Sequence, residues 1–463
     1  MADDGRLAHG EFDLGRAGRL ITREVFHRYP GKRALLHGEL GERAVVAKFY
    51  LGHWQQFLHW FHSVRGSRAL SVRGIATPEL LYAGFQPSVP AWLSVQEYIP
   101  PDEPWPPRSG DPAFEHAHRR LLETLAHHHE AGVIQRDLNW LNFIPRGGQL
   151  YTLDTDEIRV QRRPLSRHRA IGHLVRMYSS KTHLPETVVL SGYHQYGKVR
   201  HWSLDDADIR DFLLRVREGR LHHARRVATL AGRGWKHYPR EHRGGGLLIR
   251  DRRRLNPEHC RELEERLATA GTSGARAFTL GGGRAVCSLP LGTAPRRWRR
   301  HLTRRAIGAW RTLVTTQRLG LTRERHLGVI VLPTHDAWTA FLLRSPTEGI
   351  PLTTVLDQGD AVERRSLLSA LGWFLAALNH SRCIIERRPL EALTWDGRHI
   401  SLSDPRAARC IPPRRPRFSA QWEPFRRRII QDLETHGIAA TELPQPDAAR
   451  TPVPSCSHHE TSM

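Results

Sequence analysis

The sequence predicts an α+β fold of two lobes, a small sheet-rich lobe followed by a helical lobe. Strand-like runs dominate the chain as far as Pro100, and a proline-rich break, "PPDEPWPPRSGDP", occupies residues 100–112. Helical periodicity then takes over. At 463 residues the chain exceeds one ordinary hydrophobic core, so we expect more than one domain.

The small lobe is predicted to begin with a hairpin. The runs "RALLHGEL" (33–40) and "RAVVAKFYL" (43–51) flank turn residues, Gly41 and Glu42 among them. Residues 53–74 follow with Trp54, Phe57, Leu58 and Phe61 at helical spacing, which predicts an amphipathic helix. The runs "ATPELLYAGF" and "AWLSVQEYI" then predict two further strands.

The helical lobe is predicted to open with a helix over residues 114–131, which Gly132 ends. The unusual run "GVIQRDLNWLNF" (132–143) comes next, with a carboxylate and two amides among apolar residues. The run "QLYTLDTDEIRV" (149–160) predicts one strand that carries Asp154 and Asp156, and helices are expected from about residue 167 onward.

A faint internal repeat predicts a duplicated domain. The run "RAVVAKFYLG" (43–52) resembles "RAVCSLPLG" (284–292), and residues 121–142 resemble residues 367–393 in the same order, at offsets of about 240 to 250 residues. Chance similarity between Arg- and Leu-rich segments is the alternative. The boundaries that follow are a first domain at 1–205, a basic linker region at 206–246, a second domain at 247–440 and a disordered tail at 441–463.

The formal net charge of +23 indicates anionic partners such as phosphates, acidic lipid surfaces or nucleic acid. No aromatic-interleaved or helix-turn-helix pattern accompanies the basic stretch 215–270, so we do not expect nucleic acid as a partner. The five cysteines show no CxxC spacing, which indicates neither a zinc site nor a disulfide framework and favours the cytoplasm. The three consecutive residues His127 to His129 face different sides of a helix, so we do not expect a metal site there.

Four residues form the set that phosphoryl transfer needs. Asp137 and Asn142 stand five apart, Asp154 follows, and Lys48 lies far upstream in an apolar run. Such a set supplies an Asp that accepts a proton from the attacking hydroxyl, an Asn and an Asp that hold magnesium, and a Lys that binds nucleotide phosphates. Lysine is scarce, with five among 70 basic residues, so a lysine retained at position 48 needs a local reason. Loop capping by Asp137 and Asn142 is the plain alternative.

The runs "GVIQRDLNWLNF" and "LYTLDTDEIRV" resemble the protein-kinase-like fold, and within it the lipopolysaccharide kinases that phosphorylate Kdo or heptose. The likeness covers about residues 20–180. It implies that Asp137 is the catalytic base, that Asn142 and Asp154 are Mg²⁺ ligands, and that Lys48 binds the phosphates of ATP. The nearby polar residues Arg136, Asn139 and Asp156 match supporting positions.

The chain departs from the family pattern at three places. Gln135 stands where the catalytic loop usually has His, and no acid lies near Gly66 or Ser67, where a helical Glu partner for the lysine is expected. No GxGxxG loop is present, and "RYPGKR" (28–33) takes its place, so Lys32 and Arg33 are candidates for phosphate contact.

The second half is predicted to be a pseudokinase-like copy. Its counterpart of Lys48 is Ser288 or Leu289, Arg388 takes the base position, and Leu393 takes the magnesium-Asn position. Only Asp404 resembles the metal-binding Asp.

The predicted function is an ATP- and Mg²⁺-dependent kinase that phosphorylates a sugar hydroxyl of the lipopolysaccharide core or a related glycolipid. Its location would be cytoplasmic, with peripheral contact at the inner membrane. Two alternatives stay open: a protein Ser/Thr or aminoglycoside-type kinase, and a non-catalytic scaffold that binds nucleotide.

Overall fold

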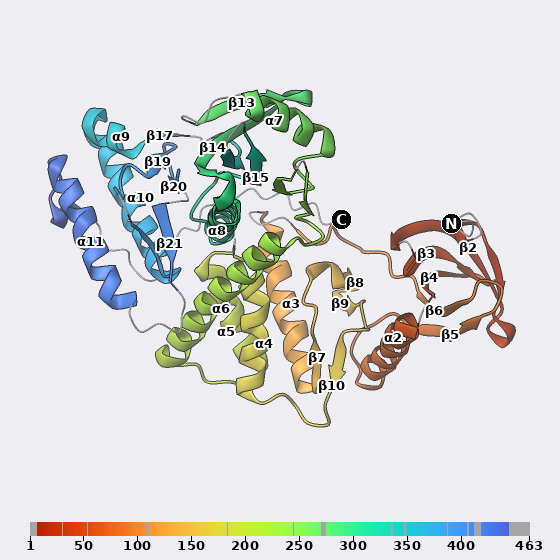
Figure 1. Ribbon diagram of the computed structural model, residues 1–463. Helices are drawn as coiled ribbons and strands as arrows, with labels where there is room; N and C mark the ends of the chain where they lie inside the picture. The colour runs from red at the N-terminus through yellow and green to blue at the C-terminus, as the bar shows by residue number, and fades with distance from the viewer. Residues whose placement is uncertain are drawn as a thin grey trace. The chain divides into compact units, whose positions relative to one another are not determined.

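The chain forms two compact units in the computed structural model (Figure 1). Unit 1 contains residues 1–174 and 188–209, and unit 2 contains residues 175–187 and 210–463. The described residues are 7–29, 31–52, 54–107, 111–182, 184–243, 245–269, 275–334, 337–346, 349–386, 388–404, 407–411 and 418–443.

Unit 1 begins with a six-stranded antiparallel sheet in the order β1-β2-β3-β4-β6-β5. The strands are β1 (Glu11–Asp13), β2 (Arg19–Tyr29), β3 (Arg33–Leu40), β4 (Arg43–Leu51), β5 (Leu80–Gln86) and β6 (Ala91–Glu97), with the short helix η1 (Gly15–Ala17) after β1. The predicted hairpin is confirmed, because β3 and β4 pair as far as Leu40 and Arg43. Alternate residues of β4, namely Val45, Ala47 and Phe49, are fully buried in the core of this sheet.

Helix α2 (Trp54–Val72) connects β4 to β5 and packs on the sheet. The Trp60 indole N–H donates to the Leu93 carbonyl at 3.0 Å, which fixes the helix against β6. The predicted helix is therefore confirmed, but its predicted apolar face is not the buried one. Trp54, Leu58 and Phe61 are exposed, whereas Val64 and Leu70 are buried.

The helical part of unit 1 follows residues 98–107, which contain no regular element. It is built from α3 (Ala113–Glu130), β7 (Val133–Gln135), η2 (Trp140–Asn142), β8 (Phe143–Arg146), β9 (Gln149–Thr152) and β10 (Ile158–Val160). Strand β7 pairs with β10, and β8 pairs with β9. Three further helices follow: α4 (Arg167–Ser180), α5 (Glu186–Val199) and α6 (Asp206–Arg233), and from Arg210 onward α6 belongs to unit 2.

The prediction of one strand over residues 149–160 is wrong. The run forms two strands with different partners, since β9 pairs with β8 and β10 pairs with β7. The segment between them leaves both ladders, and it contains Asp154, Thr155 and Asp156. Strand propensity gave no sign of this change of partner, which places the acids in a loop.

Unit 2 contains a second six-stranded antiparallel sheet, in the order β11-β12-β15-β16-β14-β13. Its elements are β11 (Arg240–Glu241), β12 (Leu247–Arg250), α7 (Pro257–Thr269), β13 (Arg276–Leu280), η3 (Gly281–Gly283), β14 (Arg284–Pro295), η4 (Arg296–Trp298), α8 (Arg299–Arg318), β15 (His326–Pro333) and β16 (Ala337–Arg344). Trp310 of α8 is fully buried and packs with the strands of this sheet.

The rest of unit 2 is helical with short strand pairs. It contains β17 (Ile350–Pro351), α9 (Leu352–Gln358), α10 (Ala361–His380), β18 (Cys383–Ile385), β19 (Leu393–Trp395), β20 (Ile400–Leu402), β21 (Ala408–Cys410), α11 (Phe418–Thr435) and η6 (Ala440–Glu442). Most of the tail predicted at 441–463 lies outside the described residues.

One cysteine pair differs from the prediction of no disulfide framework. Cys383 and Cys410 face each other across β18 and β21 and form a disulfide. The pairing depends on strand register between residues 27 positions apart, which spacing motifs do not capture.

No helix within the described ranges is both long and apolar enough to cross a membrane.

Candidate active site

The centre of the candidate site is an ion pair between residues 106 positions apart. The Lys48 Nζ lies 3.0 Å from Asp154 Oδ1. Lys48 sits in the middle of β4, paired with Leu35 of β3 and Ser94 of β6, while Asp154 lies in the loop after β9. Both side chains keep limited exposure, at 18% and 33%, so the pair is reachable from solvent.

The two partners shift each other toward the charged forms. Burial disfavours the ammonium of Lys48, yet the neighbouring Tyr50 and Asp154 outweigh it and raise its pKa. Burial likewise opposes the carboxylate of Asp154, but Lys48 and a hydrogen bond with Asp156 lower its pKa to about 2. Both groups are therefore charged at neutral pH. The Lys48 ammonium also lies 5.4 Å from the centre of the Tyr50 ring.

Helix α2 holds the loop of Asp154 and Asp156 in place. It does so near Gly66 and Ser67, where the family pattern has a helical Glu. Thr155 donates from Oγ1 to the Ser63 carbonyl at 2.8 Å, and its carbonyl oxygen lies against Gly66. A Cβ on Gly66 would come within 2.0 Å of that oxygen, so only glycine fits there. Ser67 accepts from the Gln96 amide at 3.2 Å. The loop thus occupies the space next to the helix, and Lys48 takes its acidic partner from Asp154 instead.

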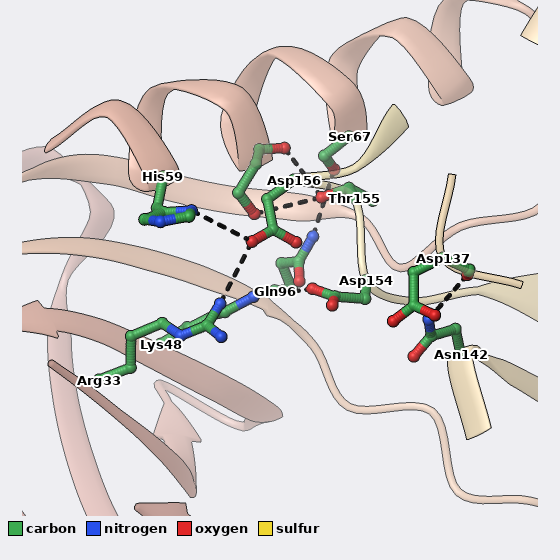
Figure 2. Close-up of polar contacts among 11 residues, drawn as sticks. Arg33, Lys48, His59, Ser67, Gln96, Asp137, Asn142, Asp154, Thr155 and Asp156 are labelled. Atoms are coloured by element: carbon green, nitrogen blue, oxygen red, sulfur yellow. Dashed lines mark hydrogen bonds and ion pairs between the residues drawn. The ribbon is translucent and has the colours of Figure 1, made fainter. Parts of the chain in front are cut away.

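Asp156 is buried and lies beside two basic side chains (Figure 2). Arg33 Nη1 lies 3.2 Å from Asp156 Oδ2, and His59 Nδ1 lies 3.7 Å from the same oxygen. Burial, followed by the hydrogen bond with Asp154, raises the pKa of Asp156 to about 6. Burial and the charge of Arg33 lower the pKa of His59, so its ring is neutral at pH 7. Arg33, which the sequence had assigned to phosphate contact, therefore contacts a carboxylate of the site.

The loop after β7 carries the predicted base. Asp137 is exposed, and its backbone carbonyl accepts from the Asn142 amide Nδ2 at 3.0 Å. The Asn142 carbonyl in turn accepts from the Leu153 N–H at 2.9 Å, so this loop is tied to the residue preceding Asp154. In the view of Figure 2, Asp154 lies between Lys48 on one side and Asp137 with Asn142 on the other.

The supporting residues of this loop have structural contacts. The Asn139 side chain caps η2 by accepting from the Leu141 N–H at 3.3 Å. Arg136 lies 3.7 Å from Glu157, and its N–H donates to the Glu157 carbonyl. Lys32 lies in the turn between β2 and β3, exposed, and its backbone bonds to Tyr29 and Leu51.

A buried histidine network supports the loop, and sequence reasoning missed its key member. His173 of α4 contacts the Gln135 carbonyl through Nε2 at 2.6 Å and His129 through Nδ1 at 2.7 Å. His129 also bonds to the Tyr196 hydroxyl at 2.6 Å. His128 contacts Thr152, and burial lowers its pKa to about 3. His128 and His129 are thus internal packing residues. His173, from another helix, contacts Gln135 at the end of β7, where the family pattern has a histidine.

The donor set around Asp154 suits Mg²⁺. Asn142 uses its amide nitrogen on Asp137, which leaves its amide oxygen for another partner. Among the described residues no group of three or more His, Cys, Asp or Glu gathers as a metal cluster. Magnesium characteristically uses one or two carboxylates together with substrate phosphates and water, so Asp154 with Asn142 fits this ion and would not form an all-protein cage.

Comparisons with known proteins find remote likeness only. No family model and no curated protein matches the chain. A structure assigned as an aminoglycoside phosphotransferase from Ralstonia eutropha matches at 10% identity and a TM-score of 0.32, over 49% of this chain and 88% of that one. Two structures of the bifunctional kinase–methyltransferase WbdD match at 15% and 14% identity, with TM-scores of 0.29 and 0.28. The matches span about half the length of the WbdD chains. Likeness this remote carries no weight for function, which rests on the site's own geometry.

Proposed function

We propose that unit 1 transfers the γ-phosphoryl group of ATP to an alcohol with the help of Mg²⁺. The observation that carries this proposal is the Lys48–Asp154 pair at 3.0 Å, with the Asp137–Asn142 loop bonded to the residue before Asp154. Phosphoryl transfer is mostly positioning and charge neutralisation, and these side chains supply both.

In the proposed reaction each side chain has one role. Asp137 accepts the proton of the acceptor hydroxyl as its oxygen bonds to the γ-phosphorus, and the bond to the β–γ bridging oxygen breaks to release ADP. Lys48 holds the phosphates by charge. Asp154 and Asn142 would hold Mg²⁺, which neutralises the phosphate charge when bound. Lys32, exposed in the β2–β3 turn, is a further candidate for phosphate contact.

The proposed acceptor is a sugar hydroxyl on the lipopolysaccharide core or a related glycolipid. Its support is the resemblance of the catalytic runs to lipopolysaccharide kinases and a net charge of +23, which suits an anionic acceptor. A protein Ser/Thr kinase and an aminoglycoside-type kinase are the alternatives of the same class. Transfer from radiolabelled ATP to glycolipid, protein and aminoglycoside acceptors separates the three. Labelling of protein or antibiotic alone would contradict the glycolipid acceptor.

We also propose that the second half of the chain is a degenerate, pseudokinase-like copy of the first. In both halves a β-hairpin precedes a long helix, two more strands of the same sheet, another long helix and short strands. The second half adds β17 and α9 before its second long helix, and β17 joins β19 and β20 in a three-stranded sheet. Lys48 lies in β4, the second strand of the first hairpin, and its counterpart in β14 is Ser288 or Leu289, both of which are buried. Asp154 lies two residues after β9, and Asp404 lies two residues after β20.

A non-catalytic nucleotide-binding scaffold is the second candidate, because α2 offers Lys48 no acidic partner and is packed on the loop at Gly66. Binding of a fluorescent ATP analogue with and without Mg²⁺, measured beside turnover, distinguishes the two. Binding without turnover on any acceptor in the panel favours the scaffold, and turnover that Asp137→Asn abolishes supports the kinase.

A further inference from the structure

The outer face of α2 presents a continuous exposed row of apolar and cationic side chains, which we call the α2 stripe. Its members recur at helical spacing, so they lie on one face. They are Trp54, Leu58, Phe61, Arg65, Arg68 and Val72. Trp54 is 70% exposed and Val72 is 83% exposed, so large apolar side chains face solvent at both ends of the stripe.

A second layer of aromatic rings supports the stripe from beneath. Phe57 packs on Trp54 with ring centres 5.0 Å apart and on Trp92 of β6 at 4.9 Å. Trp60 lies 4.4 Å from Trp92. The exposed rings therefore project from a fixed base, and little conformational freedom remains to be lost when they meet a partner.

The helix that carries the stripe has no acidic side chain of its own. No Asp or Glu occurs from Arg43 to Pro78, a segment that contains the whole of α2. Within the part of the chain that the structure describes, no ion pair joins Arg65 or Arg68 to another side chain, and both are exposed. Aromatic rings beside arginines without acids match the chemistry of an anionic lipid surface, where indoles lie at the headgroup level and guanidinium groups meet lipid phosphates.

We propose that the α2 stripe docks the protein on an anionic lipid bilayer. Trp54, Leu58 and Phe61 enter the headgroup region, and the two arginines contact lipid phosphates. A bilayer accepts a protruding row of side chains without the matching pocket that a protein partner must supply. The inference extends the proposed function by naming the face that meets a membrane-borne acceptor, but its test measures binding and not phosphoryl transfer, so the two can fail separately.

The test is co-flotation of the full chain with vesicles of phosphatidylcholine alone or of an equal mixture with phosphatidylglycerol. Trp54→Ser with Phe61→Ser keeps the net charge, so it separates the stripe from general attraction of a basic protein. We expect it to weaken binding to the mixed vesicles about ten-fold or more. Arg65→Gln with Arg68→Gln should weaken it by up to about thirty-fold.

The matched control is Val362→Ser with Arg365→Gln on the exposed start of α10, which should lose far less affinity than either stripe variant. Thermal unfolding of each variant shows whether it is folded, and the exposed positions predict little change. The proposal is overturned if wild type ignores the mixed vesicles or binds both vesicle types equally. It is equally overturned if the variant with Trp54→Ser and Phe61→Ser binds the mixed vesicles as wild type does. The same holds if this variant changes only self-association, which light scattering measures.

Discussion

The two six-stranded sheets share the pairing of four strands, β3-β4-β6-β5 and β13-β14-β16-β15, but add their other two strands at opposite edges. They also differ in what their hairpins and loops carry. In unit 1, β4 presents Lys48 to Asp154 through a partly exposed ion pair. In unit 2 an ion pair joins Arg344, the last residue of β16, to Glu324, and both side chains are almost fully buried. Arg344 also donates to the Ser403 carbonyl, next to Asp404.

The difference in exposure separates two uses of an ion pair. A buried pair is hard to replace on one side only, because the remaining charge stays without water. An accessible pair can exchange its partner for a ligand. The comparison therefore predicts that the pair in unit 2 serves stability and the pair in unit 1 serves binding and reaction.

The largest effect is expected from the base of unit 1. Asp137→Asn should lower kcat for phosphoryl transfer by about 10²- to 10⁴-fold, because the acceptor proton loses its receiver, and affinity for ATP should change little. Asp404→Asn, at the acid of unit 2 that resembles Asp154, should leave turnover nearly intact. Turnover of radiolabelled ATP measures both variants, and an equal loss of kcat in the two would place catalysis in both halves.

The buried pair of unit 2 should give the next largest effect, on stability. Glu324→Gln leaves Arg344 charged and buried, so we expect a loss of about 3–5 kcal/mol in the free energy of unfolding. Glu386→Gln breaks the exposed pair with Arg409 in the same unit and should cost at most about 1 kcal/mol. Urea denaturation followed by circular dichroism measures both, and similar losses would remove the distinction between the pairs.

Two helical glycines sharpen the comparison further. Gly66→Ala would force the new Cβ against the Thr155 carbonyl, so we expect a loss of about 2–3 kcal/mol. A Cβ added to Gly308 of α8 would meet no atom within 4 Å, so Gly308→Ala should stabilise the chain by up to about 1 kcal/mol. The same sign for both changes, measured by thermal denaturation, would contradict the close packing of α2 on the acidic loop.

The smallest effect concerns pH. The pKa of Asp156 is raised to about 6 from 3.8, so the folded state favours its protonated form. Its contribution to stability is then present below about pH 4 and is lost as the pH rises through about 6. Asp156→Asn stays neutral, so its free energy of unfolding relative to wild type should increase by on the order of 1–2 kcal/mol between those pH values. A difference independent of pH in denaturation curves would mean that Asp156 is ionised throughout.

Several elements followed from local pattern alone. The hairpin of β3 and β4, helix α2 and helix α3 have clear periodicity and turn residues, and their boundaries agree with the sequence within a few residues. The loop that carries Asp154 did not follow, because "QLYTLDTDEIRV" has the composition of one strand. The run divides because its first part pairs with β8 and its last part pairs with β7.

The sequence by itself determined the chemical parts of the site, since Lys48, Asp137, Asn142 and Asp154 are marked by residue type and spacing. Tertiary structure alone decided which of them meet and what surrounds them. It gave Lys48 its acidic partner, brought Arg33 to Asp156 and set His173 behind the loop of Gln135. Such contacts depend on the packing of segments distant along the chain, and short-range periodicity contains no information about that packing.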